Sequence, residues 1–269
     1  KKFSLVIKKP IKNFRKKIIV DSDKSISIRS FLIGSISQGV SSVQNVLESE
    51  DVFSTISCLR KLGVKILYTA NKTYKIFGRG LGSYRAKNLS KLYFGNSGTL
   101  ARLIIGIITS TPNINLNVFG DKSLNKRSMK KLINLMTKFG AEFFPKDKFN
   151  FPLRITSSNF PIGFSYETDT SAQLKSAVIL AALNSYGDTE IIEKLKSRDH
   201  TENFLKVNKS AIKINNGEIK KIRVFGKQYL NKFSIKVPGD PSSAAFFTAL
   251  TLLKKKSYLR IQNVGLNPT

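Results

Sequence analysis

The sequence is poor in residues that hold metals, disulfides or membranes. Among its 269 residues are one cysteine, one histidine and no tryptophan. A lone Cys58 excludes an internal disulfide framework, and with a lone His200 it leaves too few ligands for a zinc cluster. No apolar run reaches the roughly 18 residues of a membrane span, and no signal-peptide pattern opens the chain. We expect a soluble, cytoplasmic protein without a metal site.

Acidic residues are also scarce. The chain has 17 Asp and Glu against 46 Lys and Arg, a formal net charge of +29. Such an excess is typical of proteins that bind nucleic acid or anionic membranes. The lysines, however, are scattered through nearly every segment together with abundant Asn and Ile. This pattern favours small anionic substrates and leaves a basic nucleic-acid-binding module as an alternative.

A repeat organises the chain. Residues 23–40, 95–112 and 170–187 share one plan: a small polar start, a helical run and a turn. A strand-like run, a second helical stretch and a strand pair follow each of them. A cation recurs in the first turns at equal intervals along the sequence, and these cations are Arg29, Arg102 and Lys175. The pattern predicts three units, with the first helices packed inside and the strands outside as sheets.

The starts of these helices form a candidate anion site. Free backbone N–H groups and the helix dipole attract an anion at a helix N-terminus. In "GNSGTLAR", residues 95–102, an arginine adds a forked cation beside such donors. If the three first helices run parallel, their N-termini gather at one end. Each cation alone is explained as well by solvation of a helix end, but the repetition favours one shared site that also includes Lys24.

Six motifs lie in one order along essentially the whole chain: DKSISIRS, GNSGTLAR, GDKSLNKRSM, SAQLKSAVILAAL, SRDHTE and PGDPSSAAFF. In order and approximate spacing they resemble the enolpyruvyl transferases, and specifically the 5-enolpyruvylshikimate-3-phosphate synthases. The resemblance implies an α/β (α+β) fold. Each of its two lobes has three βαβαββ repeats, with helices inside and sheets outside.

By this resemblance, residues 21–237 form a complete first lobe of three repeats of about 70 residues. Residues 1–20 and 238–269 begin the second lobe, and "VPGDPSSAAF" is the second crossing between lobes. The chain starts with Lys1 instead of Met and stops directly after a strand-like run. We therefore expect the remainder of the second lobe to be missing.

The implied reaction moves the enolpyruvyl group of phosphoenolpyruvate to the 5-hydroxyl of shikimate 3-phosphate and releases phosphate, with no cofactor. It belongs to the shikimate pathway of aromatic amino-acid biosynthesis and is the target of glyphosate. Both substrates carry phosphate and carboxylate groups, so that bringing them together requires several fixed cations. The full-length enzyme is expected to be a cytoplasmic monomer.

The resemblance also assigns roles to individual residues. It places Lys24 between the two substrates, where a point charge serves both. The residues implied at shikimate 3-phosphate are Lys24, Ser25, Arg29, Ser171, Ala172, Gln173 and Arg198. Those implied at phosphoenolpyruvate are Lys24, Asn96, Gly98, Thr99, Arg127 and Gln173. The family's proton-transfer carboxylates would lie beyond Thr269, so we expect a half-site that binds shikimate 3-phosphate weakly and turns nothing over.

Simpler interpretations stay open for several positions. Ser25 and Ser171 could be N-caps alone, Gly98 could serve loop geometry, and Arg127 could lie on a solvated helix face. Four nearby polar residues are left out of the predicted site. Lys175, Asp199 and Glu202 are interpreted as charges at helix ends, and His200 is interpreted as structural.

The nearest alternative is the related transferase that acts on UDP-N-acetylglucosamine. That family usually carries a reactive cysteine in the loop before the arginine that matches Arg127. Here the loop reads "GDKSLNKR" and contains no cysteine. Cys58 lies on a predicted helix between apolar neighbours, where a buried, inert thiol is expected. A small residue at Gly98 resembles family members that are sensitive to glyphosate.

Overall fold

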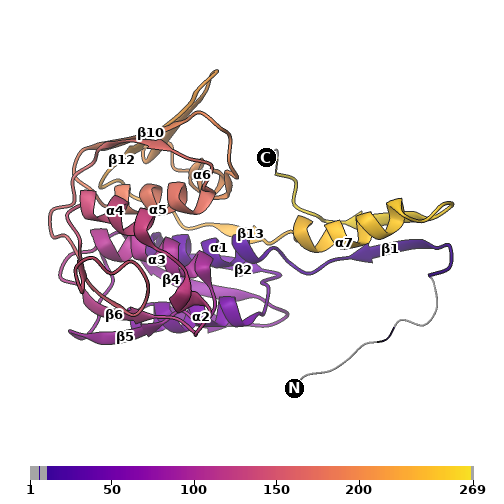
Figure 1. Cartoon of the computed structure of the whole chain (residues 1–269), viewed down its shortest axis with the longest axis horizontal. Helices are drawn as coiled ribbons and strands as arrows, with labels where there is room; N and C mark the ends of the chain where they lie inside the picture. Colours follow the sequence, from indigo (N-terminus) through magenta and orange to yellow (C-terminus); the bar gives the residue numbers. More distant parts are fainter. Residues whose placement is uncertain (1–5, 7–10, 268–269) are drawn as a thin grey trace. The chain divides into compact units, whose positions relative to one another are not determined.

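A computed structural model of the chain describes residue 6 and residues 11–267, so part of the predicted ranges 1–20 and 238–269 lies outside the described residues. These residues divide into two compact units, drawn in Figure 1. The large unit comprises residues 24–237 together with Asn267, and the small unit comprises the described residues up to Asp23 together with residues 238–266.

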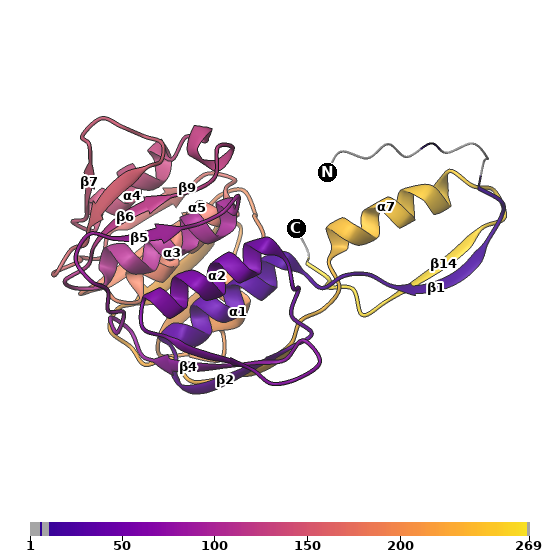
Figure 2. The same ribbon diagram turned by 90° about the horizontal axis from the view of Figure 1, so that it is seen from below.

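Three inner helices form the centre of the large unit: α1 (Lys24–Ile36), α3 (Gly98–Ser110) and α5 (Ala172–Ala182). α3 and α5 are apolar on almost all sides, α1 combines apolar residues with serines, and nearly all residues beyond the first turn of each helix are buried. A helix that is apolar all round must lie inside a protein. Figures 1 and 2 show the three helices enclosed by the other elements of the unit. The predicted inner helices are confirmed.

Three further helices and a 3-10 turn are partly exposed: α2 (Glu50–Lys61), α4 (Lys130–Lys138), α6 (His200–Leu205) and η1 (Leu124–Lys126). Acidic residues begin α2 and basic residues end it, as the helix dipole favours. Gly63 and Gly140 follow the ends of α2 and α4 with φ of +87° and +89°. Glycine suits both helix ends, since this left-handed conformation favours a residue without Cβ.

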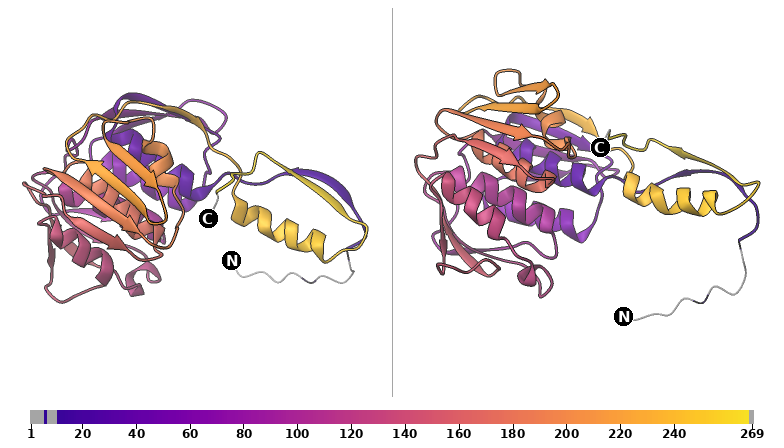
Figure 3. Two further views of the ribbon diagram at one scale, coloured as in Figure 1. Left: turned by 90° about the horizontal axis from the view of Figure 1, so that it is seen from above. Right: turned by 45° about the horizontal axis from the view of Figure 1, so that its top comes forward.

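Three four-stranded mixed sheets form the outside of the large unit. The first contains β13 (Ser234–Lys236), β2 (Gln38–Gln44), β4 (Tyr74–Arg79) and β3 (Lys65–Tyr68), in this order. The second contains β5 (Ser90–Tyr93), β6 (Asn115–Phe119), β8 (Leu153–Thr156) and β7 (Glu142–Phe144). The third contains β9 (Ser165–Thr168), β10 (Asp188–Glu193), β12 (Lys220–Phe225) and β11 (Ile212–Asn216). Figure 3 shows these sheets around the helices.

Each sheet belongs to one βαβαββ repeat, and all three have the same order: two parallel strands followed by an antiparallel pair. The second and third repeats are continuous in sequence. The first repeat takes its leading strand from the far end of the unit, because β13 pairs in parallel with Ser42–Gln44 of β2. The large unit is therefore a closed ring of three repeats.

Close packing of α3 on α5 fixes the centre of this ring. A Cβ on Gly106 of α3 would overlap the carbonyl oxygen of Ala177 and would lie 3.0 Å from its carbonyl carbon. Glycine at this position therefore allows the two backbones to approach. The approach also brings the first turns of α3 and α5 within reach of each other.

The small unit contains two parallel strands, β1 (Arg15–Ile19) and β14 (Tyr258–Gln262), and the helix α7 (Pro241–Leu252), which contacts β14. Asp240 caps α7 by accepting a hydrogen bond from the Ser242 N–H at 2.7 Å. Ala244 is the one residue of α7 that is buried, and Phe246 and Leu252 are about 80% exposed. In the described part of the chain, no helix is both long and apolar enough to cross a membrane.

Candidate anion-binding site

The N-terminus of α3 supplies the first group of donors. Ser97 is its N-cap, and the Ser97 hydroxyl accepts a hydrogen bond from the Leu100 N–H at 3.3 Å. Arg102 lies one turn further on and donates from Nη1 to the Gly98 carbonyl at 3.1 Å. The guanidinium is thereby turned back towards the helix start, where free backbone N–H groups already favour an anion.

A second guanidinium reaches the same point from another loop. Arg127 follows η1, and its Nη2 donates to Asn96 Oδ1 at 2.8 Å. A Cβ on Gly98 would lie 2.8 Å from Arg102 Nη1 and 3.1 Å from Arg127 Nη1. Two cations thus converge on a residue that has no side chain. Burial first, and then the charge of Arg127, lower the pKa of Arg102. Within the described residues neither arginine pairs with a carboxylate, so the cluster favours an anion.

Gln173 joins the starts of α3 and α5. Its Oε1 accepts from Arg102 Nη1 at 3.0 Å, and its Nε2 donates to Thr99 Oγ1 at 3.0 Å. Ser171 caps α5 by accepting from the Leu174 N–H at 3.4 Å, as its simplest interpretation predicts. Ala172 is the first residue of the helix. Five of the six residues predicted at phosphoenolpyruvate therefore lie together with Arg102, and these are Asn96, Gly98, Thr99, Arg127 and Gln173.

The start of α1 supplies the second group. Arg29 is 3% exposed and is held by two hydroxyls, Thr201 Oγ1 at 2.9 Å from Nε and Ser176 Oγ at 3.2 Å from Nη2. It also donates to the carbonyl of Ser25 at 3.2 Å. Arg29 thus links α1 with α5 and α6. At the first residue of α1, Lys24 is half exposed and forms an ion pair with Asp51 at 3.1 Å.

Arg198 lies in the loop between β10 and α6. Its side chain is exposed, and among the described residues it has neither a hydrogen-bond partner nor an ion pair. Its neighbours in the sequence are firmly held, Ser197 by Glu193 and Asp199 by Asn203. Arg198 therefore presents a cation to solvent from a loop whose backbone is anchored.

Two carboxylates beside the predicted residues were not foreseen. Asp51 pairs with Lys24, and Asp169 accepts from the Ser171 N–H at 3.0 Å and from Lys131 Nζ at 2.6 Å. The hydrogen bond from Lys131 is the main cause of a lowered pKa at Asp169. An aspartate two residues before a helix N-cap is a recognisable turn signal in the sequence. Asp169 therefore places a negative charge beside Ser171, one of the residues predicted to bind an anion.

The interpretation of Lys175 and Glu202 as charges that solvate helix ends is wrong. Both side chains are fully buried and lie 2.7 Å apart as an ion pair. Lys175 therefore adds no accessible cation to the anion site, although it occupies the position in its repeat that Arg102 occupies in the second. The signal was present in "QLKSAVILAA", where Lys175 interrupts a helix that is apolar on all sides.

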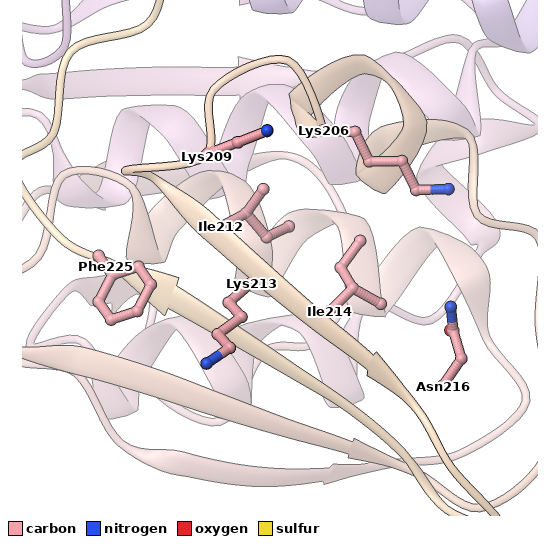
Figure 4. A pocket seen from close by; sticks show the side chains of 7 residues that line it. All are labelled: Lys206, Lys209, Ile212, Lys213, Ile214, Asn216 and Phe225. Atoms are coloured by element: carbon pink, nitrogen blue, oxygen red, sulfur yellow. The ribbon is translucent and has the colours of Figure 1, made fainter.

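Possible metal ligands, the single cysteine and a surface hollow were compared with the anion site. No group of three or more His, Cys, Asp or Glu side chains there could hold a metal ion. Cys58 is 1% exposed and burial raises its pKa to about 12, which confirms the prediction of a buried thiol. Figure 4 shows a hollow on the third sheet, lined by Lys206, Lys209, Ile212, Lys213, Ile214, Asn216 and Phe225. None of the predicted site residues lines it.

The fold and the site define an α/β lobe of three repeats that collects anion-binding groups at helix N-termini. A model of the EPSP synthase (3-phosphoshikimate 1-carboxyvinyltransferase) family matches residues 8–269. The 3-phosphoshikimate 1-carboxyvinyltransferase of Paramagnetospirillum magneticum is 38% identical over 252 residues, which cover 93% of this chain and 56% of that protein. The enzyme of the same name from Ruthia magnifica is 39% identical over 267 residues, covering 99% of this chain and 60% of its own length.

A solved EPSP synthase from Acinetobacter baumannii has the same fold, with a TM-score of 0.83 and 34% identity over 95% of this chain and 57% of that one. The chain belongs to the EPSP synthase family. It spans 56–60% of the length of the curated relatives that it matches.

Proposed function

We propose that this chain takes part in the transfer of the enolpyruvyl group from phosphoenolpyruvate to the 5-hydroxyl of shikimate 3-phosphate. Membership of the EPSP synthase family supports the reaction. The main structural observation that supports the proposal for this chain is the convergence of Arg102 and Arg127 on Gly98 at a helix N-terminus. Such a site accepts a phosphate or a carboxylate, and both substrates bear both groups.

In this proposal the two substrates use two neighbouring groups of donors. Phosphoenolpyruvate is bound at the start of α3, where Gly98 leaves room for an anion beside two guanidiniums. Shikimate 3-phosphate is bound by the start of α5, by Arg29 and by Arg198. Gln173 touches both helices and therefore borders both ligands. Lys24, half exposed at the start of α1, serves both substrates as a point charge.

The contribution of this chain is to bind and to orient. Enolpyruvyl transfer joins two polyanions, so the fixed cations offset their mutual repulsion and hold the 5-hydroxyl against the enol carbon. Arg29 suits this role because its guanidinium is already fixed by two hydroxyls. We assign no proton-transfer carboxylate to the described residues, and we propose that the chain alone forms a half-site without turnover.

We also propose the domain arrangement that the family implies. Residues 21–237 form one complete lobe, which the compact large unit supports. Residues 1–20 and 238–269 contribute to a second lobe. The whole enzyme is a cytoplasmic monomer in this proposal and requires no cofactor.

The experiment is a calorimetric titration of shikimate 3-phosphate into the chain at near-physiological salt. Arg29→Ala and Arg198→Ala serve as site variants, and UDP-N-acetylglucosamine serves as the rival ligand. Saturable binding that both variants weaken at least tenfold supports the proposal. Binding of UDP-N-acetylglucosamine in its place contradicts the assigned substrate. Turnover by this chain with phosphoenolpyruvate contradicts the assignment of a half-site.

A further inference from the structure

Four charged side chains form a cluster inside the large unit, and the proposed binding residues do not include them. We call Lys175, Glu193, Glu202 and Lys220 the buried quartet. Lys175 Nζ lies 2.7 Å from Glu193 Oε1 and 2.7 Å from Glu202 Oε1. Lys220 Nζ lies 3.1 Å from Glu193 Oε2 and 3.0 Å from Glu202 Oε1. Three of the side chains are fully buried and Lys220 is 8% exposed.

Stability alone does not explain the quartet. Removing charges from water is costly, and apolar replacements of buried ion pairs are often neutral or stabilising. Glu202 Oε2 is buried and has no hydrogen-bond partner in the described part of the chain, which adds to the cost. A charged cluster differs from an apolar one in that its hydrogen bonds have direction. The question is therefore what the quartet orients.

One contact of the quartet reaches the loop that carries Arg198. This β10–α6 loop comprises residues 194–199. Glu193 Oε1 accepts hydrogen bonds from the Ser197 N–H at 2.9 Å and from the Ser197 hydroxyl at 2.6 Å. Lys175 Nζ donates to the Ser197 carbonyl at 3.4 Å. All polar groups of Ser197, the residue before Arg198, are thus bonded to the quartet.

The quartet also holds the helix just beyond the loop, because its member Glu202 belongs to α6, a helix of only six residues. Glu202 follows Thr201 in this helix. The Thr201 hydroxyl accepts from Arg29 and donates to Ser176 Oγ at 2.8 Å. Ser176 is the residue after Lys175. The quartet therefore fixes the segment on both sides of Arg198 and ties it to α5 less than two turns from its N-terminus.

Asp199 at the end of the β10–α6 loop accepts a hydrogen bond from Asn203 Nδ2 at 2.7 Å, but the restraints on residues 194–196 are weak. Lys194, Leu195 and Lys196 are exposed. The ion pair between Lys194 and Glu167 is 2.8 Å long, but both side chains are more than half exposed. Exposed pairs of this kind contribute little. Among the described residues, Ser197 is the one buried side chain of the loop.

We propose that the buried quartet is a positioning network, which holds Arg198 and Thr201 in a fixed relation to Arg29 and to the start of α5. This inference rests on the proposed function, because the ligand so clamped is shikimate 3-phosphate. Neither the quartet nor Ser197 touches the ligand. They act through the backbone of Arg198 and through the hydroxyl of Thr201.

The test compares two buried serines whose hydroxyls are hydrogen-bonded. Ser197→Ala removes the 2.6 Å bond to Glu193, and Ser185→Ala removes a bond to the Ala182 carbonyl near the far end of α5. For each protein, calorimetry gives the affinity for shikimate 3-phosphate. Hydrogen–deuterium exchange gives the protection of peptides that cover residues 194–199 and, as an internal reference, α3.

We expect Ser197→Ala to weaken binding about tenfold and to speed exchange in the β10–α6 loop about tenfold, with α3 unchanged. Ser185→Ala should change both quantities less than twofold. Unchanged exchange in the loop overturns the inference, and so does faster exchange with unchanged affinity. If the wild-type chain does not bind shikimate 3-phosphate, the proposed function fails, and exchange alone decides whether Ser197 holds the loop.

A second pair of variants separates positioning from stability. Glu202→Gln leaves two buried lysines with one carboxylate and should lower the melting temperature. The double variant Lys175→Met/Glu202→Gln restores the charge balance, so we expect it to recover stability. If its affinity for shikimate 3-phosphate stays at least tenfold reduced, positioning is supported. If affinity returns together with stability, the quartet is structural and the inference is overturned.

Discussion

In the proposed function, the binding of phosphoenolpyruvate depends most directly on Gly98. A Cβ there would meet the ends of Arg102 and Arg127 at 2.8 and 3.1 Å, and both ends are flexible enough to move. Gly98→Ala should therefore fold, with a gain in helix propensity, but displace both guanidiniums. We expect at least tenfold weaker binding of phosphoenolpyruvate in the presence of shikimate 3-phosphate, measured by calorimetry. Equally weakened binding of shikimate 3-phosphate alone would show a general distortion instead.

The carboxyl of Glu193 gives the fold a definite response to acid. Burial acts to raise the pKa of Glu193, but hydrogen bonds from Lys175 and Ser197 outweigh it and the pKa is lowered from 4.5. A lowered pKa in the folded state stabilises the protein above the unfolded value, and this stabilisation is lost as the pH falls through the folded value.

Urea unfolding between pH 5 and pH 3 should therefore show a falling free energy of unfolding, with a smaller slope in Glu193→Gln. Glu190→Gln, in the same strand and outside the buried quartet, should keep the wild-type slope. Equal slopes in all three proteins would contradict the assignment.

Prediction from the sequence was best for residues that lie at helix starts and weakest for charges that are buried. Ser171 is the N-cap of α5 and Gln173 lies in its first turn, as the repeat predicts, but Lys175 and Glu202 were taken as solvated. A single sequence records the type of a residue and not its partner, and the partners of Lys175 lie in other elements, at the end of β10 and in α6. The cost of burying a charge is invisible until those partners are known.

Among the elements, α3 and α5 make the closest approach. A Cβ on Gly106 would overlap the backbone of Ala177, which cannot move aside as a side chain can. We expect Gly106→Ala to lower the free energy of unfolding by about 1–3 kcal/mol, as overpacking does. Gly34→Ala in α1 is the matched control, since the nearest atoms to its Cβ would belong to side chains, Ile76 Cδ1 at 3.1 Å and Ser41 Cβ at 3.4 Å. Urea denaturation of both variants measures the difference, and equal stability would contradict tight packing at Gly106.

The order of elements was predictable because each unit repeats the same periodicities. The inner helices, their strand partners and the glycine stops follow from local patterns. The origin of β13 does not, because its partner β2 lies near the opposite end of the large unit's sequence and no local pattern encodes a distant edge. The family resemblance supplied the six-element repeat, whereas the structure supplied the strand that completes the first one.

At the scale of the whole molecule, β13 closes the ring of repeats. Without it, β2 becomes an open edge of the first sheet. We expect a chain of residues 24–237 to unfold cooperatively in urea and a chain of residues 24–230, which lacks β13, to lose that cooperativity and bind a hydrophobic dye. Identical unfolding midpoints for the two would show that the closing strand is dispensable.

The pairing of β1 with β14 can form only late in protein synthesis, because the two strands lie far apart in the sequence. The two strands are in register from Arg15 with Tyr258, so residues 24–237 of the large unit are synthesised between them. At roughly 5–20 residues per second, β1 emerges from the ribosome and waits about 12–50 s for its partner. Its first three residues are Arg15, Lys16 and Lys17, and such charges discourage a solitary strand from pairing with a neighbouring nascent chain. The basic character of this strand therefore favours correct pairing during synthesis, before the fold is complete.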